Sequence, residues 1–191
     1  MIRLVLFSFL FLSDCKNPKL GGNLIYVPEP NLTDEVAILK VSKQVFGDLL
    51  RETKLEKEQK GYKLFIEFGG STALTFYGKQ AYVKDIKLMI CRKANQMFYN
   101  LKDRNLETLT ISFVKPYYVK DNELNKEIIQ EFEVFRVRFE KTDLEKISNW
   151  KEKAEKLLKN EARPKETVEF LDSIRKNWNV ELDEFYRVEI K

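Results

Sequence analysis

The sequence predicts an α+β fold, in which a two-layer antiparallel sheet packs against amphipathic helices and the chain includes a C-terminal helix pair. The first observation is the order of the segments, because strands and helices are segregated rather than regularly alternating. The second is the composition: 43% hydrophobic and 13% aromatic residues in a chain of 191 suffice for a packed core. We find no internal repeat and no low-complexity segment.

The first part of the folded region reads as helix, strand, helix. A helix is predicted from the N-cap Thr33, with apolar residues at three- and four-residue steps, and it should fade in the charged stretch after Leu55. Residues 62–68 alternate between apolar and polar, which predicts a strand ending at the following glycine pair. A second amphipathic helix is predicted over residues 81–101.

A long β-hairpin is predicted next. Residues 106–119 are rich in strand-forming residues, and Pro116 places the far end of this strand at an edge. A turn is expected at residues 120–123, and residues 128–140 return as the second strand. The apolar residues of this second strand switch parity after two positions: Phe132 and Val134, then Phe135, Val137 and Phe139. This switch predicts a β-bulge.

The C-terminal part is predicted to be mainly helical. Thr142 or Asp143 would cap a charged amphipathic helix that continues to Lys159. Pro164 is suited to the first turn of a further helix. Residues 180–190 alternate loosely enough to form a last strand.

The charge and motif content argues against several functional classes. The net charge is only +4, and acidic residues are interspersed with basic ones, so no basic stripe suited to nucleic acid is present. The chain contains no His, which removes Ser-His and Cys-His nucleophile pairs and imidazole metal sites. The glycine-rich stretch Gly69–Thr72 lacks a phosphate-binding glycine pattern, so we read it as a turn. No cofactor, metal or catalytic set is predicted.

The first fifteen residues carry the strongest functional signal. An apolar run extends from Leu4 to Leu12, preceded by Arg3. A nine-residue helix would rise only about 13 Å, which is too short to span a hydrocarbon core of about 30 Å. It has the length of a signal-peptide core, and it has no polar face that would suit a buried helix or strand.

A cysteine follows this run in the order Leu12-Ser13-Asp14-Cys15. The segment resembles a bacterial lipoprotein signal peptide, whose lipobox has Leu three positions before a Cys. Asp14 departs from the Gly, Ala or Ser usual in that family, and the looser form is spirochaete-like. The resemblance implies that residues 1–14 are removed as a signal peptide and that Cys15 is acylated, for example with palmitate, and anchors the protein to a membrane of the bacterial cell envelope.

A tether and a folded region would follow the anchor. Residues 15–32 contain three of the five prolines and read as a Pro- and Gly-containing tether, in which residues 24–27 are predicted to dock as a short edge strand. Residues 33–191 are predicted to form a single α+β domain, with 141–179 as its helical part. Cys91 is expected to be a buried, inert thiol, and a Cys15–Cys91 disulfide is the alternative if Cys15 is not modified.

Three functions remain open at this stage. The first is a lipid-anchored envelope protein with a non-catalytic binding or structural role. The second is a small-ligand pocket protein or enzyme of cone-shaped α+β type, with a pocket at the bulge near Phe135 and near Tyr117 and Tyr118 in the partner strand. Its chemistry would need a buried carboxylate: Glu67, Glu131 or Glu133. The third is a soluble secreted or periplasmic binding module without lipid.

Overall fold

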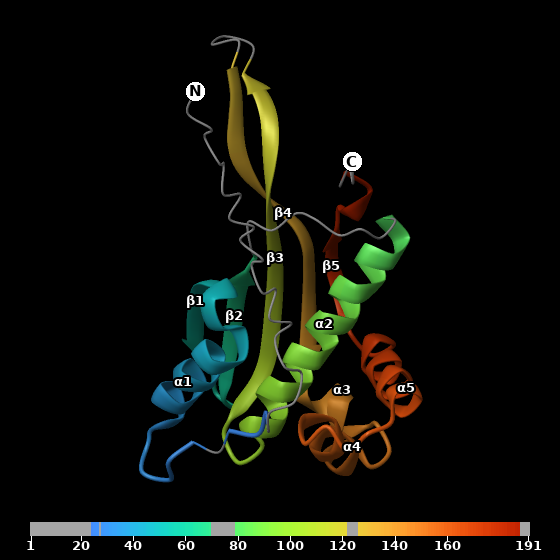
Figure 1. Cartoon of the computed structure of the whole chain (residues 1–191). Helices are drawn as coiled ribbons and strands as arrows, with labels where there is room; N and C mark the ends of the chain where they lie inside the picture. Colours follow the sequence, from blue (N-terminus) through green and yellow to red (C-terminus); the bar gives the residue numbers. More distant parts are fainter. Residues whose placement is uncertain (1–23, 27, 70–78, 122–125, 188–191) are drawn as a thin grey trace, which may run out of the picture.

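The computed structural model describes residues 24–26, 28–69, 79–121 and 126–187. Within these residues, one five-stranded mixed sheet packs against helices, which confirms the α+β class (Figure 1). The strands lie in the order in which they follow one another along the chain, β1-β2-β3-β4-β5. The elements are α1 (Asp34–Phe46), β1 (Leu50–Lys57), β2 (Tyr62–Phe68), α2 (Lys79–Asn100), β3 (Leu106–Asp121), β4 (Lys126–Glu140), α3 (Lys141–Glu145), α4 (Trp150–Leu158), α5 (Pro164–Arg175) and β5 (Asn179–Asp183).

The sheet contains one parallel pair. β1 and β2, β3 and β4, and β4 and β5 pair antiparallel, whereas β2 and β3 run parallel. The sequence prediction of an antiparallel sheet is therefore corrected at this one pair. The cause is α2, which connects β2 to β3 and carries the chain back to the end of the sheet at which β2 begins.

Three helices form the second layer. α2 crosses the sheet with α1 on one side and α5 on the other (Figure 1). β2 shows the expected alternation. Tyr62, Leu64 and Ile66 are buried, and Lys63, which lies between the first two, is exposed. α4 packs against α2 through a buried contact, in which Trp150 Nε1 donates to Asn95 Oδ1 at 3.0 Å.

The first helix is shorter than predicted. Its N-cap is confirmed, because the Thr33 hydroxyl accepts the Val36 N–H at 3.4 Å. It ends at Phe46, because Gly47 adopts a φ of +54°, and a 3₁₀ turn follows. Residues 50–57 then form β1, so the predicted helix through Leu55 is wrong there. Pairing of this segment with β2 outweighs its helical spacing.

The C-terminal helices also differ in detail. The predicted helix from Thr142 to Lys159 is split into α3 and α4, because Asn149 adopts a left-handed φ of 55° between them. The helix starting at Pro164 is confirmed as α5, and the Glu166 carboxylate accepts the Arg163 N–H at 3.2 Å. The predicted last strand is confirmed only as the short β5, because a 3₁₀ turn follows it and residues 188–190 lie outside the described residues.

The hairpin and its bulge are confirmed. The register of β3 and β4 shifts between Phe113 and Val114, which pair with Phe135 and Glu133 and leave Val134 as the extra residue. Both Val134 and Phe135 are buried. The strands run two residues further than predicted on either side of the turn, and residues 122–123 of the predicted turn lie outside the described residues.

Candidate functional site

The long hairpin extends beyond the rest of the sheet. The pairing of β2 with β3 ends at Phe68 and Phe113, and the pairing of β4 with β5 ends at Phe135 and Asp183. Beyond these pairs, Val114–Asp121 of β3 and Lys126–Glu133 of β4 pair only with each other among the described strands. We call this two-stranded ribbon the arm. Figure 1 shows it projecting from one end of the molecule.

A close backbone contact supports the base of the arm. Gly69 follows β2, and its N–H donates to the Leu49 carbonyl at 3.0 Å. A Cβ at Gly69 would lie 2.2 Å from the Val114 carbonyl oxygen, which is closer than any side chain tolerates. Only glycine therefore permits β3 to pass at this distance. Gly70–Thr72, the rest of the predicted glycine turn, lies outside the described residues.

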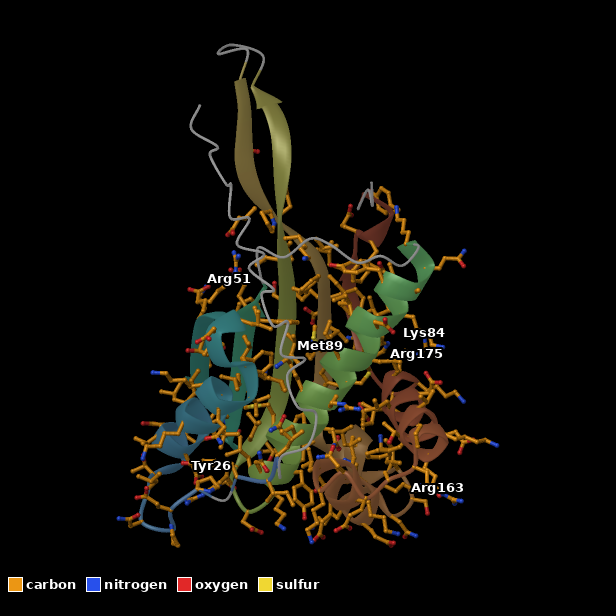
Figure 2. All side chains as sticks on the ribbon, in the orientation of Figure 1. Tyr26, Arg51, Lys84, Met89, Arg163 and Arg175 are labelled. Atoms are coloured by element: carbon orange, nitrogen blue, oxygen red, sulfur yellow. The ribbon has the colours of Figure 1, made fainter. Side chains whose placement is uncertain are left out.

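An arginine connects the sheet edge to the arm. Arg51 of β1 donates through Nη1 to the Glu131 carboxylate of β4, and its Nε donates to the Gly69 carbonyl at 3.4 Å. Figure 2 shows Arg51 at the end of β1, beside the start of the arm. β1 and β4 are not neighbours in the sheet. The contact forms where the hairpin twists beyond the end of β2 and β4 crosses toward the side of β1 (Figure 1).

The predicted carboxylates are brought to this same region, but as structural partners. Glu133 accepts from the Ser112 hydroxyl at 2.5 Å and from the Arg136 guanidinium, with Nε at 2.7 Å. This carboxylate raises the pKa of Arg136 through its hydrogen bond. Glu67 is the register partner of Ser112 on β2, and Glu131 is paired with Arg51. The two paired carboxylates neutralise arginines and brace the arm.

On the helix-facing side, the bulge lies against a row of aromatic rings. The ring centroids of Phe135 and Phe185 lie 5.3 Å apart, and those of Phe135 and Trp178 lie 5.5 Å apart. Lys87 Nζ lies 5.0 Å from the centroid of the Phe135 ring and 2.6 Å from an Asp183 carboxylate oxygen. Packed rings thus fill the space beside Phe135. The side chains of Tyr117 and Tyr118 lie outside the described residues.

The chain enters the fold at the opposite end. We call residues 24–26 and 28–32 the strap. Its backbone is held at Leu24, whose N–H donates to the Leu158 carbonyl at 3.0 Å and whose carbonyl accepts from Gln96 Nε2 at 3.0 Å. The Tyr26 N–H donates to Asn100 Oδ1 at 3.1 Å. Residues 24–26 do not join the sheet, so the predicted edge strand is corrected there: α2 supplies side-chain amides that satisfy this backbone instead.

A single arginine holds the end of the strap. Arg104 follows α2 and donates to the carbonyls of Leu32 at 2.9 Å and Glu29 at 3.0 Å. It also pairs with Asp34 in the first turn of α1, with 3.3 Å between Nη1 and Oδ1. Sequence reasoning missed these contacts, although Gln96 and Asn100 are amides on the buried side of an amphipathic helix. Figure 2 shows Tyr26 at the end of the molecule away from the arm.

The structure describes one of the two cysteines, Cys91. Cys91 is a free and fully buried thiol on α2, which confirms that it is buried, and burial raises its pKa. Cys15 lies outside the described residues, as does the whole predicted signal peptide. Across the described part of the chain, no helix has the length and hydropathy of a membrane span, and no cluster of three or more metal-ligating side chains occurs.

The described surface also has hollows away from the arm. A groove of about 340 Å³ lies between α4 and α5, and its lining includes Lys156, Glu166 and Phe170. Lys156 pairs there with Glu152 at 2.7 Å, and Glu166 pairs with Arg163. Glu152, Lys156 and Glu166 in the groove are therefore already partnered.

α2 also carries a partly buried lysine. Lys93 Nζ donates to the Val45 carbonyl at 2.6 Å and lies 4.8 Å from the centroid of the Phe46 ring, at the C-terminal end of α1. Burial lowers the pKa of Lys93 from its ordinary 10.5 to about 8. The folded protein therefore releases this proton at a lower pH than the unfolded chain does.

We expect the stability of the protein relative to a Lys93→Met variant to rise as the pH increases from about 8 to about 10.5. In this window the unfolded chain binds the proton and the folded protein does not, so unfolding takes up a proton and becomes less favourable at higher pH. Chemical denaturation of both proteins at two pH values in this window should show a gain of about 1–2 kcal/mol. Ionisation of Cys91 affects both proteins equally and cancels. Parallel pH profiles would contradict the assignment.

No protein-family model, curated protein or solved structure matches the chain.

Proposed function

We propose that the protein is a lipid-anchored component of the bacterial cell envelope, attached through Cys15, and that its α+β region has a non-catalytic binding role carried by the arm. The observation that carries the anchoring is the sequence Leu12-Ser13-Asp14-Cys15 after an apolar run too short to span a bilayer. Each acyl CH₂ group that is buried in the membrane contributes about 0.8 kcal/mol to binding, so two or three acyl chains hold a protein firmly to a membrane.

The arrangement of the molecule supports this proposal. The strap lies at one end of the fold and the arm projects from the other (Figure 1). The tether residues 16–23 would span at most about 25–30 Å when fully extended. A domain held at the strap would thus keep the strap end near the membrane, and the arm would project outward, where a partner in solution or on another surface is accessible.

The non-catalytic part of the proposal is supported by the surroundings of the bulge. Packed rings fill the space beside Phe135, and Glu131 and Glu133 are engaged by arginines. A general base needs a carboxylate that reaches a substrate, and these two form ion pairs with the fold itself.

Metabolic labelling with palmitate tests the anchor. We expect the full-length chain, expressed in a bacterium that acylates lipoproteins, to incorporate palmitate and to partition into the detergent phase of Triton X-114. A Cys15→Ser variant should lose both properties. The matched control is Cys91→Ala, which removes the buried thiol and should retain both.

An unlabelled wild-type chain, or a Cys15→Ser variant that still carries palmitate, would refute the anchor. Cleavage at another position without lipid would instead favour the soluble secreted or periplasmic module. Mass spectrometry of the N-terminus distinguishes these outcomes.

A further inference from the structure

The strap advances along α2 at the pace of an extended chain. Asn100 Oδ1 accepts the Tyr26 N–H at 3.1 Å, and Gln96, one helical turn earlier, donates to the Leu24 carbonyl at 3.0 Å. Two residues of the strap thus correspond to one turn of α2. Four residues of helix rise about 6 Å and two residues of extended chain advance about 7 Å, so the correspondence can continue over several turns. From Tyr26 back to Leu24, the chain runs toward the N-terminal end of α2.

The face of α2 beyond Gln96 carries side chains that suit such a continuation. Arg92 lies one turn further along the same row, and Leu88 lies one turn beyond Arg92. Burial lowers the pKa of Arg92, and no carboxylate of the described residues forms an ion pair with it. Leu88 and its neighbour Met89 are only partly buried, and Figure 2 shows Met89 near the middle of α2.

The residues that precede Leu24 match this face in the same order. They read Leu20-Gly21-Gly22-Asn23 and lie outside the described residues. Carbonyls of alternate residues in an extended chain point to the same side, so the Gly22 carbonyl would face Arg92 as the Leu24 carbonyl faces the turn before. The two glycines have no side chain that would hold the backbone away from the helix.

We propose that the four residues before the strap dock along α2 and continue the strap in this register. The Gly22 carbonyl accepts from the Arg92 guanidinium, and a hydrogen bond from a charged donor is stronger than one from a neutral donor. Leu20 packs against Leu88 and Met89 and removes their exposed apolar surface from water. The occupant of this helix face is therefore the chain's own tether.

The competing course crosses the end of α4, because the Leu158 carbonyl accepts the Leu24 N–H. That course leads toward α5 and the groove that the two helices form. Lys156 and Glu166 line this groove and already have partners, whereas no carboxylate of the described residues pairs with Arg92. The face of α2 thus offers the better match.

Docking moves the point at which the tether leaves the fold from the strap to the middle of α2. In an anchored molecule, the free tether would shrink to residues 16–19, which span at most about 14 Å. The helix layer as well as the strap end would then lie near the membrane. Only this consequence rests on the anchor proposed above, because the docking itself does not require acylation of Cys15.

Disulfide trapping tests the register. The full-length chain is prepared with Cys15→Ser and Cys91→Ala, so that only engineered thiols remain. In this background, Leu20→Cys with Met89→Cys should oxidise under copper phenanthroline at least tenfold faster than Leu20→Cys with Thr167→Cys. Thr167 lines the groove between α4 and α5 and represents the competing course.

Two pairs of matched variants test the contacts separately. Arg92→Met should slow trapping at least threefold because it removes the donor, whereas Lys84→Met on the exposed part of the same helix should not. The Met89 methyl resonance gives a readout without engineered cysteines: Leu20→Asp should shift it, and Lys19→Asp, one residue earlier, should leave it unchanged.

Equal trapping of the two cysteine pairs, faster trapping at Thr167, or an unchanged Met89 methyl resonance in Leu20→Asp would each overturn the docking. Equal effects of Arg92→Met and Lys84→Met would refute the role of Arg92. Trapping is measured without Cys15 and palmitate labelling depends on it, so failure of the docking and failure of the anchor are distinguishable.

Discussion

Replacement of Phe135 by alanine is expected to lower the free energy of unfolding by about 3–5 kcal/mol. The side chain has no exposed surface, and its ring lies 5.3 Å from that of Phe185 and 5.5 Å from that of Trp178. Truncation would leave a cavity where β4 changes direction at the bulge, and it would remove the ring beneath Lys87. The expected decrease in Tm is roughly 10 °C.

Phe132→Ala is the matched control for this prediction. Phe132 lies on the other side of the bulge and is 41% exposed, so its truncation should cost less than about 1 kcal/mol. Thermal and urea denaturation of the two variants provide the comparison. Equal costs would show that the rings beside the bulge do not form the tight core described above.

Gly69→Ala should destabilise the protein by about 2–3 kcal/mol. The added Cβ would overlap the Val114 carbonyl oxygen, 2.2 Å away, and that oxygen belongs to backbone that is fixed by strand pairing. β3 would have to move away from the end of β2. We therefore expect the base of the arm to open, and amide exchange at Val114–Asp121 to accelerate more than elsewhere in the sheet.

Gly47→Ala separates this local effect from general destabilisation. Gly47 has a φ of +54°, but no atom lies within 4 Å of the position that a Cβ would occupy, so alanine there is strained without a clash. We expect a cost of about 1–3 kcal/mol with no preferential exchange in the arm. If Gly69→Ala accelerates exchange only in proportion to its loss of stability, the close contact does not support the arm.

The features that could be predicted from the sequence are those with local signals. The bulge could be predicted because its extra residue shifts the parity of the apolar positions before and after Val134. The N-cap at Thr33 and the helix start at Pro164 have side-chain chemistry suited to those positions. Cys91 was predictable as buried because it lies within an amphipathic helix.

The features that could not be predicted depend on distant partners. Residues 50–57 have apolar spacing compatible with a helix, and only their pairing with β2 makes them a strand. The strap is held mainly through its own backbone atoms, which every sequence possesses. The bracing of the arm by Arg51 joins residues 80 positions apart in the chain, and nothing near either residue indicates the other.

The way the strap is fastened determines how the protein responds to mechanical load. If the protein is anchored as proposed, a pull on the residues before Leu24 would load the hydrogen bonds at Leu24 and Tyr26 before the contacts of Arg104. We expect these bonds to break one after another while the sheet stays intact. Release of residues 24–33 would lengthen the chain between the anchor and the folded region by about 30 Å, without unfolding of the sheet.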